Sequence, residues 1–336
     1  MKKSLIALAV LASTGAAMAQ SSVTLYGRAD VNYQWTDNAA FNSGNKWSQQ
    51  SGGLGGSRIG FRGVEDLGNG LKAGFVIEGS VNIGEGSSSG SANRQSFVSL
   101  SGGFGEVRFG KQYTLNDSFA GTYGGAAGTV WGLGATALAH NGVSEGEGRW
   151  TNAATYISPN FSGLKLSAQA ATKETDYSGA GKAPYAVALD YANGPVGAGF
   201  AASKNGGEGT AALYQVGGSY DFGPVALLGA YQYNKNLDKK NAATVGLKAP
   251  FGATTLRLTY NWAQQASYTS ENDAFNVSTT DTTDTGKIQS LGLGADYKLS
   301  KRSTVYAGYN YVKAKNAVYD NKKSVNQVLV GFDHWF

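Results

Sequence analysis

The chain has 336 residues but no cysteine and only two histidines, His140 and His334. Without cysteine it does not rely on the disulfides that hold many small secreted domains together, and it offers no thiol nucleophile. Neither histidine stands in the spacing of a catalytic triad or a metal site, so we expect no enzymatic activity, no metal and no cofactor. The Gly-rich stretch 52–60 lacks the G-x-x-x-x-G-K pattern of a phosphate-binding loop, and we interpret its glycines as loop flexibility.

Dense basic clusters with interleaved aromatics are also missing, so nucleic acid is not an expected partner. Only one apolar run stands out, after Lys2 and Lys3, and it is too short to span a bilayer. It is followed by Ala17-Met18-Ala19, which predicts a secretory signal peptide over residues 1–19 and a mature chain over 20–336. Removing the two lysines lowers the formal net charge from +5 to +3.

Glycine and aromatic residues are abundant, with 49 Gly, 19 Tyr, 14 Phe and 6 Trp against 5 Pro. This composition suits many short strands, tight turns and aromatic belts, whereas runs rich in Leu, Glu and Lys that favour helices are missing. Residues 22–35, 71–83 and 256–262 alternate apolar with polar side chains, which predicts strands with one apolar and one wet face. A soluble β-sandwich alternates in the same way, so the period alone does not decide between the two.

Turn residues occur in a regular order that favours one large closed sheet. Seven short turns are expected at 65–70, 101–105, 159–163, 193–195, 222–224, 249–252 and 299–302. Eight longer polar segments alternate with them, at 36–55, 84–91, 113–148, 173–183, 204–210, 236–240, 265–287 and 316–324. Fifteen connections join sixteen strands, so the fold class we predict is all-β: a 16-stranded antiparallel transmembrane β-barrel.

Closure is a physical requirement for such a sheet, because an open edge in hydrocarbon leaves backbone N–H and C=O groups without partners. The first strand must therefore pair with the last. The last strand ends in an alternating apolar row whose final residue is Phe336. We expect this row to face lipid.

The longest loop, 113–148, combines many glycines with Phe119, Tyr123 and Trp131 and carries few charges. A loop of this length in a compact fold is usually functional or disordered. Its aromatic and small residues indicate packing, and a sixteen-stranded barrel has room inside. We therefore predict that it folds inward as a constriction loop.

Arginines provide the candidate pore residues. Five arginines occupy the alternating positions of their strands that are expected to face water: Arg28, Arg58, Arg62, Arg108 and Arg149. The sequence does not show on which face Arg94 lies. An arginine facing lipid at the bilayer midplane would cost about 2 to 4 kcal/mol, so the lumen is favoured. The simpler alternative is that they solvate a polar wall and pair with carboxylates, among them Glu78 on the wet face of its strand. Unpaired arginines in a narrow passage would favour anions.

Several segments together resemble one family, the general diffusion porins of β-proteobacteria. They are residues 22–27 (SVTLYG), 57–63 (SRIGFRG), 65–68 (EDLG), 70–75 (GLKAGF), 94–100, 105–110 (GEVRFG), 156–161 and 330–336 (VGFDHWF). The resemblance runs nearly end to end. It implies a homotrimer in the outer membrane, surrounded by lipid and lipopolysaccharide, that passes small ions and hydrophilic solutes.

The resemblance also implies roles for single residues. Arg58, Arg94 and Arg149 match the basic cluster that faces the constriction loop in anion-selective members. Gln95 stands where some of those relatives have a second basic residue, and Glu145 and Glu147 lie close to Arg149, so we expect only a modest anion preference. Phe336 resembles the signal read by the barrel-assembly machinery.

Three alternatives stay open from the residues alone. The barrel could be a solute-specific channel, it could be an adhesin or anchor that presents its long loops, or the chain could be a soluble secreted all-β binding protein. Sixteen strands leave much interior to fill, which favours a pore over an anchor.

Overall fold

The structure is a computed structural model that describes residues 22–37, 46–88, 92–124, 148–172, 182–204, 212–234, 240–265, 286–315 and 324–336. The signal peptide predicted over residues 1–19 lies outside this part of the chain. The strands are β1 (Ser22–Thr36), β2 (Lys46–Ser51), β3 (Arg58–Gly68), β4 (Leu71–Asn82), β5 (Ser87–Ser88), β6 (Gln95–Gly102), β7 (Gly105–Tyr113), β8 (Arg149–Ile157), β9 (Leu164–Ala171), β10 (Tyr185–Asn193), β11 (Val196–Lys204), β12 (Ala212–Asp221), β13 (Ala226–Asn234), β14 (Lys240–Phe251), β15 (Thr254–Gln265), β16 (Gly286–Lys298), β17 (Ser303–Lys315) and β18 (Ser324–Trp335).

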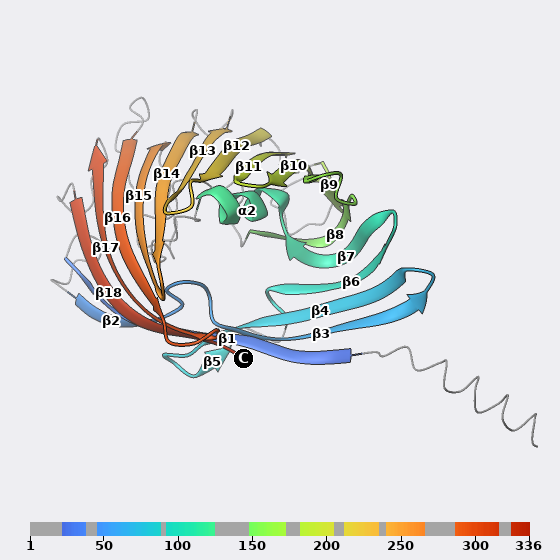
Figure 1. The fold of residues 1–336 in the computed structure, drawn as a ribbon, viewed down its shortest axis with the longest axis horizontal. Helices are drawn as coiled ribbons and strands as arrows, with labels where there is room; N and C mark the ends of the chain where they lie inside the picture. Colours follow the sequence, from blue (N-terminus) through green and yellow to red (C-terminus); the bar gives the residue numbers. More distant parts are fainter. Residues whose placement is uncertain are drawn as a thin grey trace, which may run out of the picture.

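All strand pairings are antiparallel, and β18 pairs with β1, so the sheet closes into a barrel (Figure 1). β2 and β3 share one position in the wall, because both pair with β1, along residues 31–36 and 22–28 respectively. β5 is a two-residue branch on the end of β4. Within the described part of the chain the wall therefore has sixteen strand positions, and the predicted 16-stranded antiparallel barrel is confirmed.

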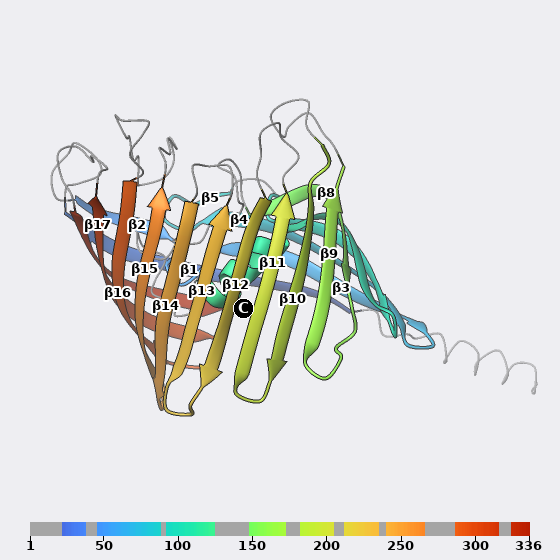
Figure 2. The same ribbon diagram turned by 90° about the horizontal axis from the view of Figure 1, so that it is seen from above.

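The seven short turns expected from the sequence all join successive strands, and Figure 2 shows them at the end of the barrel drawn lowest. Glycine is needed where the chain reverses through a left-handed conformation, as at Gly223 and Gly252, whose φ angles are 92° and 60°. Because these turns are short, neighbouring strands stay in register along the wall. The strands tilt relative to the barrel axis, as closure requires (Figure 2).

The outer face of the barrel is apolar and flanked by aromatic side chains. Between the two ends it exposes aliphatic residues such as Val187, Leu189, Val216, Val245, Leu247 and Leu293. Exposed aromatic residues lie nearer the strand ends, among them Tyr185, Tyr214 and Tyr233 at one end and Tyr220, Phe222, Phe251 and Tyr297 at the other. An apolar band between two aromatic belts matches a bilayer with its two interfaces.

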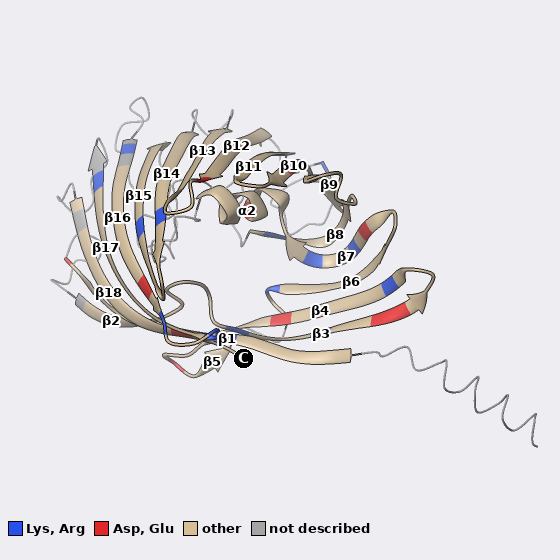
Figure 3. Ribbon diagram, in the orientation of Figure 1, with Lys and Arg blue, Asp and Glu red and all other residues tan. Residues whose placement is uncertain are grey.

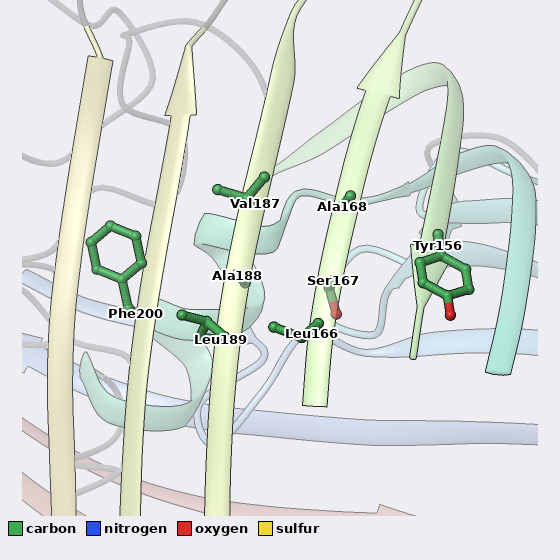
Figure 4. Close-up of a pocket in the computed structure, with 8 residues that line it drawn as sticks. All are labelled: Tyr156, Leu166, Ser167, Ala168, Val187, Ala188, Leu189 and Phe200. Atoms are coloured by element: carbon green, nitrogen blue, oxygen red, sulfur yellow. The ribbon is translucent and has the colours of Figure 1, made fainter. Parts of the chain in front are cut away.

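A hollow in this outer face, of about 350 Å³, lies over β8 to β11. Figure 4 shows Tyr156, Leu166 and Val187 around the small side chain of Ala168. Its lining is almost entirely apolar, so it is part of the lipid-facing surface and not a site for a hydrophilic solute. No helix in the described ranges is both long and apolar enough to cross a bilayer.

The interior of the barrel holds the only buried core of any size among the described residues. The helix α2 (Leu115–Phe119) and the π-helical turn η1 (Ala120–Gly124) follow β7 and lie inside the wall, next to β9 to β13 (Figure 1). Their apolar side chains pack against a row of small wall residues: Ala153, Ala171, Ala186, Ala188, Ala201, Ala230 and Ala242. The described start of the 113–148 loop thus folds inward, as predicted.

Candidate functional site

The constriction begins where the chain leaves β7 and turns into the lumen. Thr114 caps α2, since its hydroxyl accepts a hydrogen bond of 3.1 Å from the backbone N–H of Asp117. Asn116 is 1% exposed and its Nδ2 donates to Oε1 of Gln215 on β12 at 2.9 Å. Gln215 in turn donates to Gln232 on β13 at 3.1 Å. This chain of amides ties the helix to the wall, although the buried Oδ1 of Asn116 itself has no hydrogen-bond partner among the residues that the structure describes.

Two aromatic rings complete the attachment. Phe119 and Tyr123 lie 5.0 Å apart between ring centroids and are 3% and 5% exposed. A Cβ on Gly199 would lie 2.5 Å from the Tyr123 ring, and one on Gly217 would lie 3.0 Å from Phe119. The wall is therefore made of glycine where the rings rest. Burial, with a smaller contribution from the Asp190 carboxylate, raises the pKa of the Tyr123 phenol, which stays neutral.

Across the interior from α2 lies the wall of β3 and β4, where Glu78 draws two arginines together. Arg94 Nε is 2.6 Å from Glu78 Oε1, and Arg58 Nη1 is 3.9 Å from the same oxygen. Glu78 is 3% exposed, and its other oxygen accepts from the Tyr26 hydroxyl at 3.0 Å. Both carboxylate oxygens are thus engaged, which allows the charge to be buried.

The third arginine joins through Tyr113, the last residue of β7. Its hydroxyl accepts hydrogen bonds from Arg94 Nη2 at 2.5 Å and from Arg149 Nη2 at 2.8 Å. The Arg149 guanidinium also lies over the Tyr113 ring, 4.2 Å from its centroid. We call Arg58, Arg94 and Arg149 the basic cluster. The Glu78 carboxylate forms ion pairs with two of its three members, Arg58 and Arg94.

The other three arginines predicted for the pore are placed differently. Arg28 is 9% exposed and binds Asp333, with Nε 2.7 Å from Oδ1, while its Nη2 lies 3.4 Å from Asp30. Arg108 makes two bonds of 2.9 and 2.8 Å to Glu106. Arg62 is exposed and lies over the Tyr26 ring at 5.2 Å. Figure 3 shows basic and acidic residues along β3, β4 and β7.

Tyr113 is a site residue that alternation along the strand could not identify. β7 contains a bulge between Gly110 and Gln112, and Gly110 has a φ of 132°. The bulge shifts the alternation of side chains between the two faces of the strand. Alternation counted from Arg108 therefore places Tyr113 on the outer face, although it lies on the inner one. A glycine three residues before the end of the strand is the one sequence feature that points to the bulge.

The C-terminal residue pairs with β1 and so takes part in closing the barrel. Phe336 exchanges backbone hydrogen bonds with Gly27, of 3.0 and 3.2 Å, and its ring rests where a Cβ of Gly27 would be. Val328, Val330 and Phe332 in the same row are exposed on the outer face, as predicted. Trp131, His140, Glu145 and Glu147, which the sequence analysis placed in the constriction loop, lie outside the described residues.

A closed antiparallel barrel with an apolar outer band, a polar inner wall and a helix folded into its interior is a membrane-spanning β-barrel channel. Residues 4–317 match the family described as Gram-negative porin. The chain therefore belongs to the Gram-negative porin family, as its resemblance to the β-proteobacterial members predicted. It is a channel of the bacterial outer membrane and not an enzyme, and the soluble alternative is excluded.

Relatives with known names agree with this assignment. The chain is 36% identical over 340 residues to outer membrane porin protein 32 of Delftia acidovorans, covering 94% of this chain and 91% of that protein. The solved anion-selective porin from Comamonas acidovorans is 28% identical, has a TM-score of 0.75 and is covered completely, with 94% of this chain. A trimer form of OmpT of Vibrio cholerae, 16% identical with a TM-score of 0.70 over 94% of this chain and 99% of that one, shares the fold.

Proposed function

We propose that this porin passes small hydrophilic solutes and ions by passive diffusion, with a modest preference for anions set by the basic cluster. The observation that carries the proposal is the convergence of Arg58, Arg94 and Arg149 around one carboxylate and one phenol. A net positive wall beside a helix that narrows the lumen concentrates anions, because the low-dielectric surroundings strengthen the field in the passage. The name of the anion-selective Comamonas relative fits the same preference.

The preference is modest because the cluster is partly compensated. Glu78 engages two of its three members, and Arg108 is paired with Glu106. On the opposite wall Arg257 is paired with Asp296. Each of these pairs removes charge from the field that a passing ion meets.

Reversal potentials in a planar bilayer with a salt gradient test the assignment. We expect both Arg94→Ser and Arg149→Ser to shift the reversal potential toward that of a cation-preferring pore. Arg62→Ser is the matched control, since Arg62 is exposed and has only a contact with the Tyr26 ring. If both cluster variants keep the reversal potential of the unmodified protein, the cluster does not set the selectivity.

Several properties belong to the same proposal on the strength of the family. These are a homotrimer in contact with lipopolysaccharide and lipid, a signal peptide over residues 1–19, a constriction loop over about 113–148, and Phe336 as the residue read by the assembly machinery. Stepwise conductance in triplets would support the trimer. Failure of a Phe336→Ser variant to reach the outer membrane at normal levels would support the role of Phe336.

A further inference from the structure

Between β2 and β3 the chain leaves the wall of the barrel. Residues 52–57, here called the inner segment, face only Ala29 and Asp30 of β1, so six residues stand opposite two. The hydroxyls of Ser51 and Ser57 lie 3.1 Å apart and close the base of this excursion. The Ser57 hydroxyl accepts a hydrogen bond from the backbone N–H of Asp30 and donates one to its carbonyl oxygen. It thus replaces the backbone partner that a neighbouring strand would supply. The wall stays hydrogen-bonded although the chain departs from it.

The inner segment lies inside the barrel. Leu54 packs against Tyr306 and Leu329, and Leu329 is 1% exposed. Leu329 alternates with the lipid-facing Val328 and Val330, so it points into the lumen. The segment therefore covers the inner face of β17 and β18 next to β1, where Figure 1 shows the chain between β2 and β3.

Its covering role is clearest at Asp30, which has 0% exposure although it stands on the lumen face of β1. The backbone N–H groups of Leu54 and Gly55 donate to Asp30 Oδ2 at 2.7 and 2.9 Å. The Tyr306 hydroxyl donates to Oδ1 at 2.5 Å. The segment thus supplies hydrogen bonds that take the place of pore water around this carboxylate.

Arg28, Asp30 and Asp333 form a buried group beside the basic cluster, with one more acidic than basic side chain. Arg28 is within ion-pair distance of both Asp30 and Asp333, at 3.4 and 2.7 Å, so one cation meets two carboxylates. The Trp335 ring connects it to the cluster, with the guanidinium groups of Arg28 and Arg58 at 4.8 and 5.9 Å from its centroid. An Asp30 exposed to pore water would oppose the field of Arg58.

Close packing explains Gly53, which corrects our interpretation of the Gly-rich stretch as loop flexibility. A Cβ on Gly53 would lie 2.0 Å from the Tyr306 hydroxyl oxygen, and one on Gly331 would lie 2.2 Å from the ring. Tyr306 therefore packs closely against both glycines. A larger residue at position 53 must displace the inner segment.

We propose that the inner segment is a selectivity element that withdraws the Asp30 carboxylate from the pore, so that this carboxylate does not oppose the basic cluster. The proposal rests on the anion preference proposed above and adds to it a determinant that carries no charge of its own. A carboxylate in contact with the pore solution attracts cations directly, and the hydrogen bonds and the Arg28 ion pair that keep Asp30 away from the solution remove this direct attraction.

Gly53→Val tests the proposal in the intact protein, with the ratio of anion to cation permeability read from the reversal potential. We expect the ratio to fall about twofold, because uncovering one unit charge in the passage shifts the local ion populations by a factor of this order. Gly103→Val is the matched control, since a Cβ there meets nothing within 4 Å. An unchanged ratio in Gly53→Val, with the protein folded and conducting, overturns the proposal.

Adding Asp30→Asn to Gly53→Val separates the charge from the shape of the pore. If the exposed carboxylate causes the shift, the double variant recovers the permeability ratio of the unmodified protein. If the double variant keeps the ratio of the single one, the segment acts by shape alone and the proposal is wrong. This comparison is independent of the test of the basic cluster. A shift that Asp30→Asn reverses supports the withdrawal of Asp30 from the pore even if Arg94→Ser and Arg149→Ser leave the reversal potential unchanged.

Tyr306→Phe is a second variant for the case in which Gly53→Val does not fold. It removes the hydrogen bond to Asp30 Oδ1 and keeps the ring between its two glycines. We expect a smaller shift in the same direction, again reversed by Asp30→Asn. No shift in this variant, together with no folded Gly53→Val, counts against the proposal.

Discussion

The hydroxyl of Tyr113 accepts hydrogen bonds from Arg94 and Arg149, so one neutral oxygen holds two guanidinium groups at the edge of the constriction. Arg94 directly precedes β6 and Arg149 is the first residue of β8, on either side of β7. Like charges at this separation repel, and a shared acceptor offsets part of that repulsion. The position of the cluster therefore depends on a residue that has no charge.

Tyr113→Phe tests this dependence without changing the charge of the pore. The variant keeps the ring beneath Arg149 but loses both hydrogen bonds, each worth about 1.5 to 3 kcal/mol for a charged donor. We expect the two guanidinium groups to spread and the anion preference to weaken, with single-channel conductance close to normal. Reversal potentials measure the change. Tyr231→Phe on the outer face is the control, and equal potentials in both variants would rule out a positioning role for Tyr113.

Glu78→Gln removes the carboxylate from the basic cluster and preserves the size of the side chain. The amide oxygen can still accept from Arg94, so the cluster keeps its geometry while its net charge rises by one. We expect a stronger anion preference than in the unmodified protein. The opposite result, a weaker preference, would mean that Glu78 acts mainly by holding the arginines in place.

Gly199→Leu tests the attachment of the constriction helix. The new side chain occupies the place of the Tyr123 ring, which lies 2.5 Å from the position of a Cβ at residue 199. We expect η1 and α2 to move off the wall toward the open lumen, with a fall in single-channel conductance. Gly103→Leu is the control in an open turn. Normal conductance in Gly199→Leu would show that the helix is held by the amide chain through Asn116.

Arg28→Ala tests the ionic seam where the barrel closes. The variant leaves the carboxylates of Asp30 and Asp333 in place without their cation, and breaking such a buried pair costs about 3 to 5 kcal/mol. We expect the folded barrel to lose its compact mobility in detergent gels at a lower temperature. Arg62→Ala, at an exposed position, should have a small effect. Equal unfolding temperatures for the two variants would show that the Arg28 ion pairs do not stabilise the closed barrel.

Much of the barrel was predictable because its determinants are local. The alternation in residues 22–35 reports which side chains face lipid and which face the lumen, and each short turn lies within a few residues of the strands that it joins. The number of strand positions then follows from the number of connections. The wet parity of Arg58 and Arg149 was readable for the same reason.

The interruption between β2 and β3 was not predictable in this way. The sequence of residues 52–57 is rich in glycine, which is compatible with a flexible loop and with close packing alike. The pairing of β1 with both β2 and β3 shows that these residues leave the wall, and the packing of Leu54 against Leu329 places them in the lumen. The partners of the segment, Tyr306 and Leu329, are more than 240 residues away along the chain.

The sequence by itself determined the class of protein, the number of strand positions and the face on which most charged side chains lie, because period and turn chemistry act over a few residues. The tertiary structure alone decided which charges are available to a passing ion. Arg28 and Arg58 look alike in the sequence, yet Arg28 is held by two carboxylates while Arg58 shares Glu78 with Arg94. Closing the barrel brings together residues from both ends of the chain, and charge compensation depends on distances in space that no local pattern encodes.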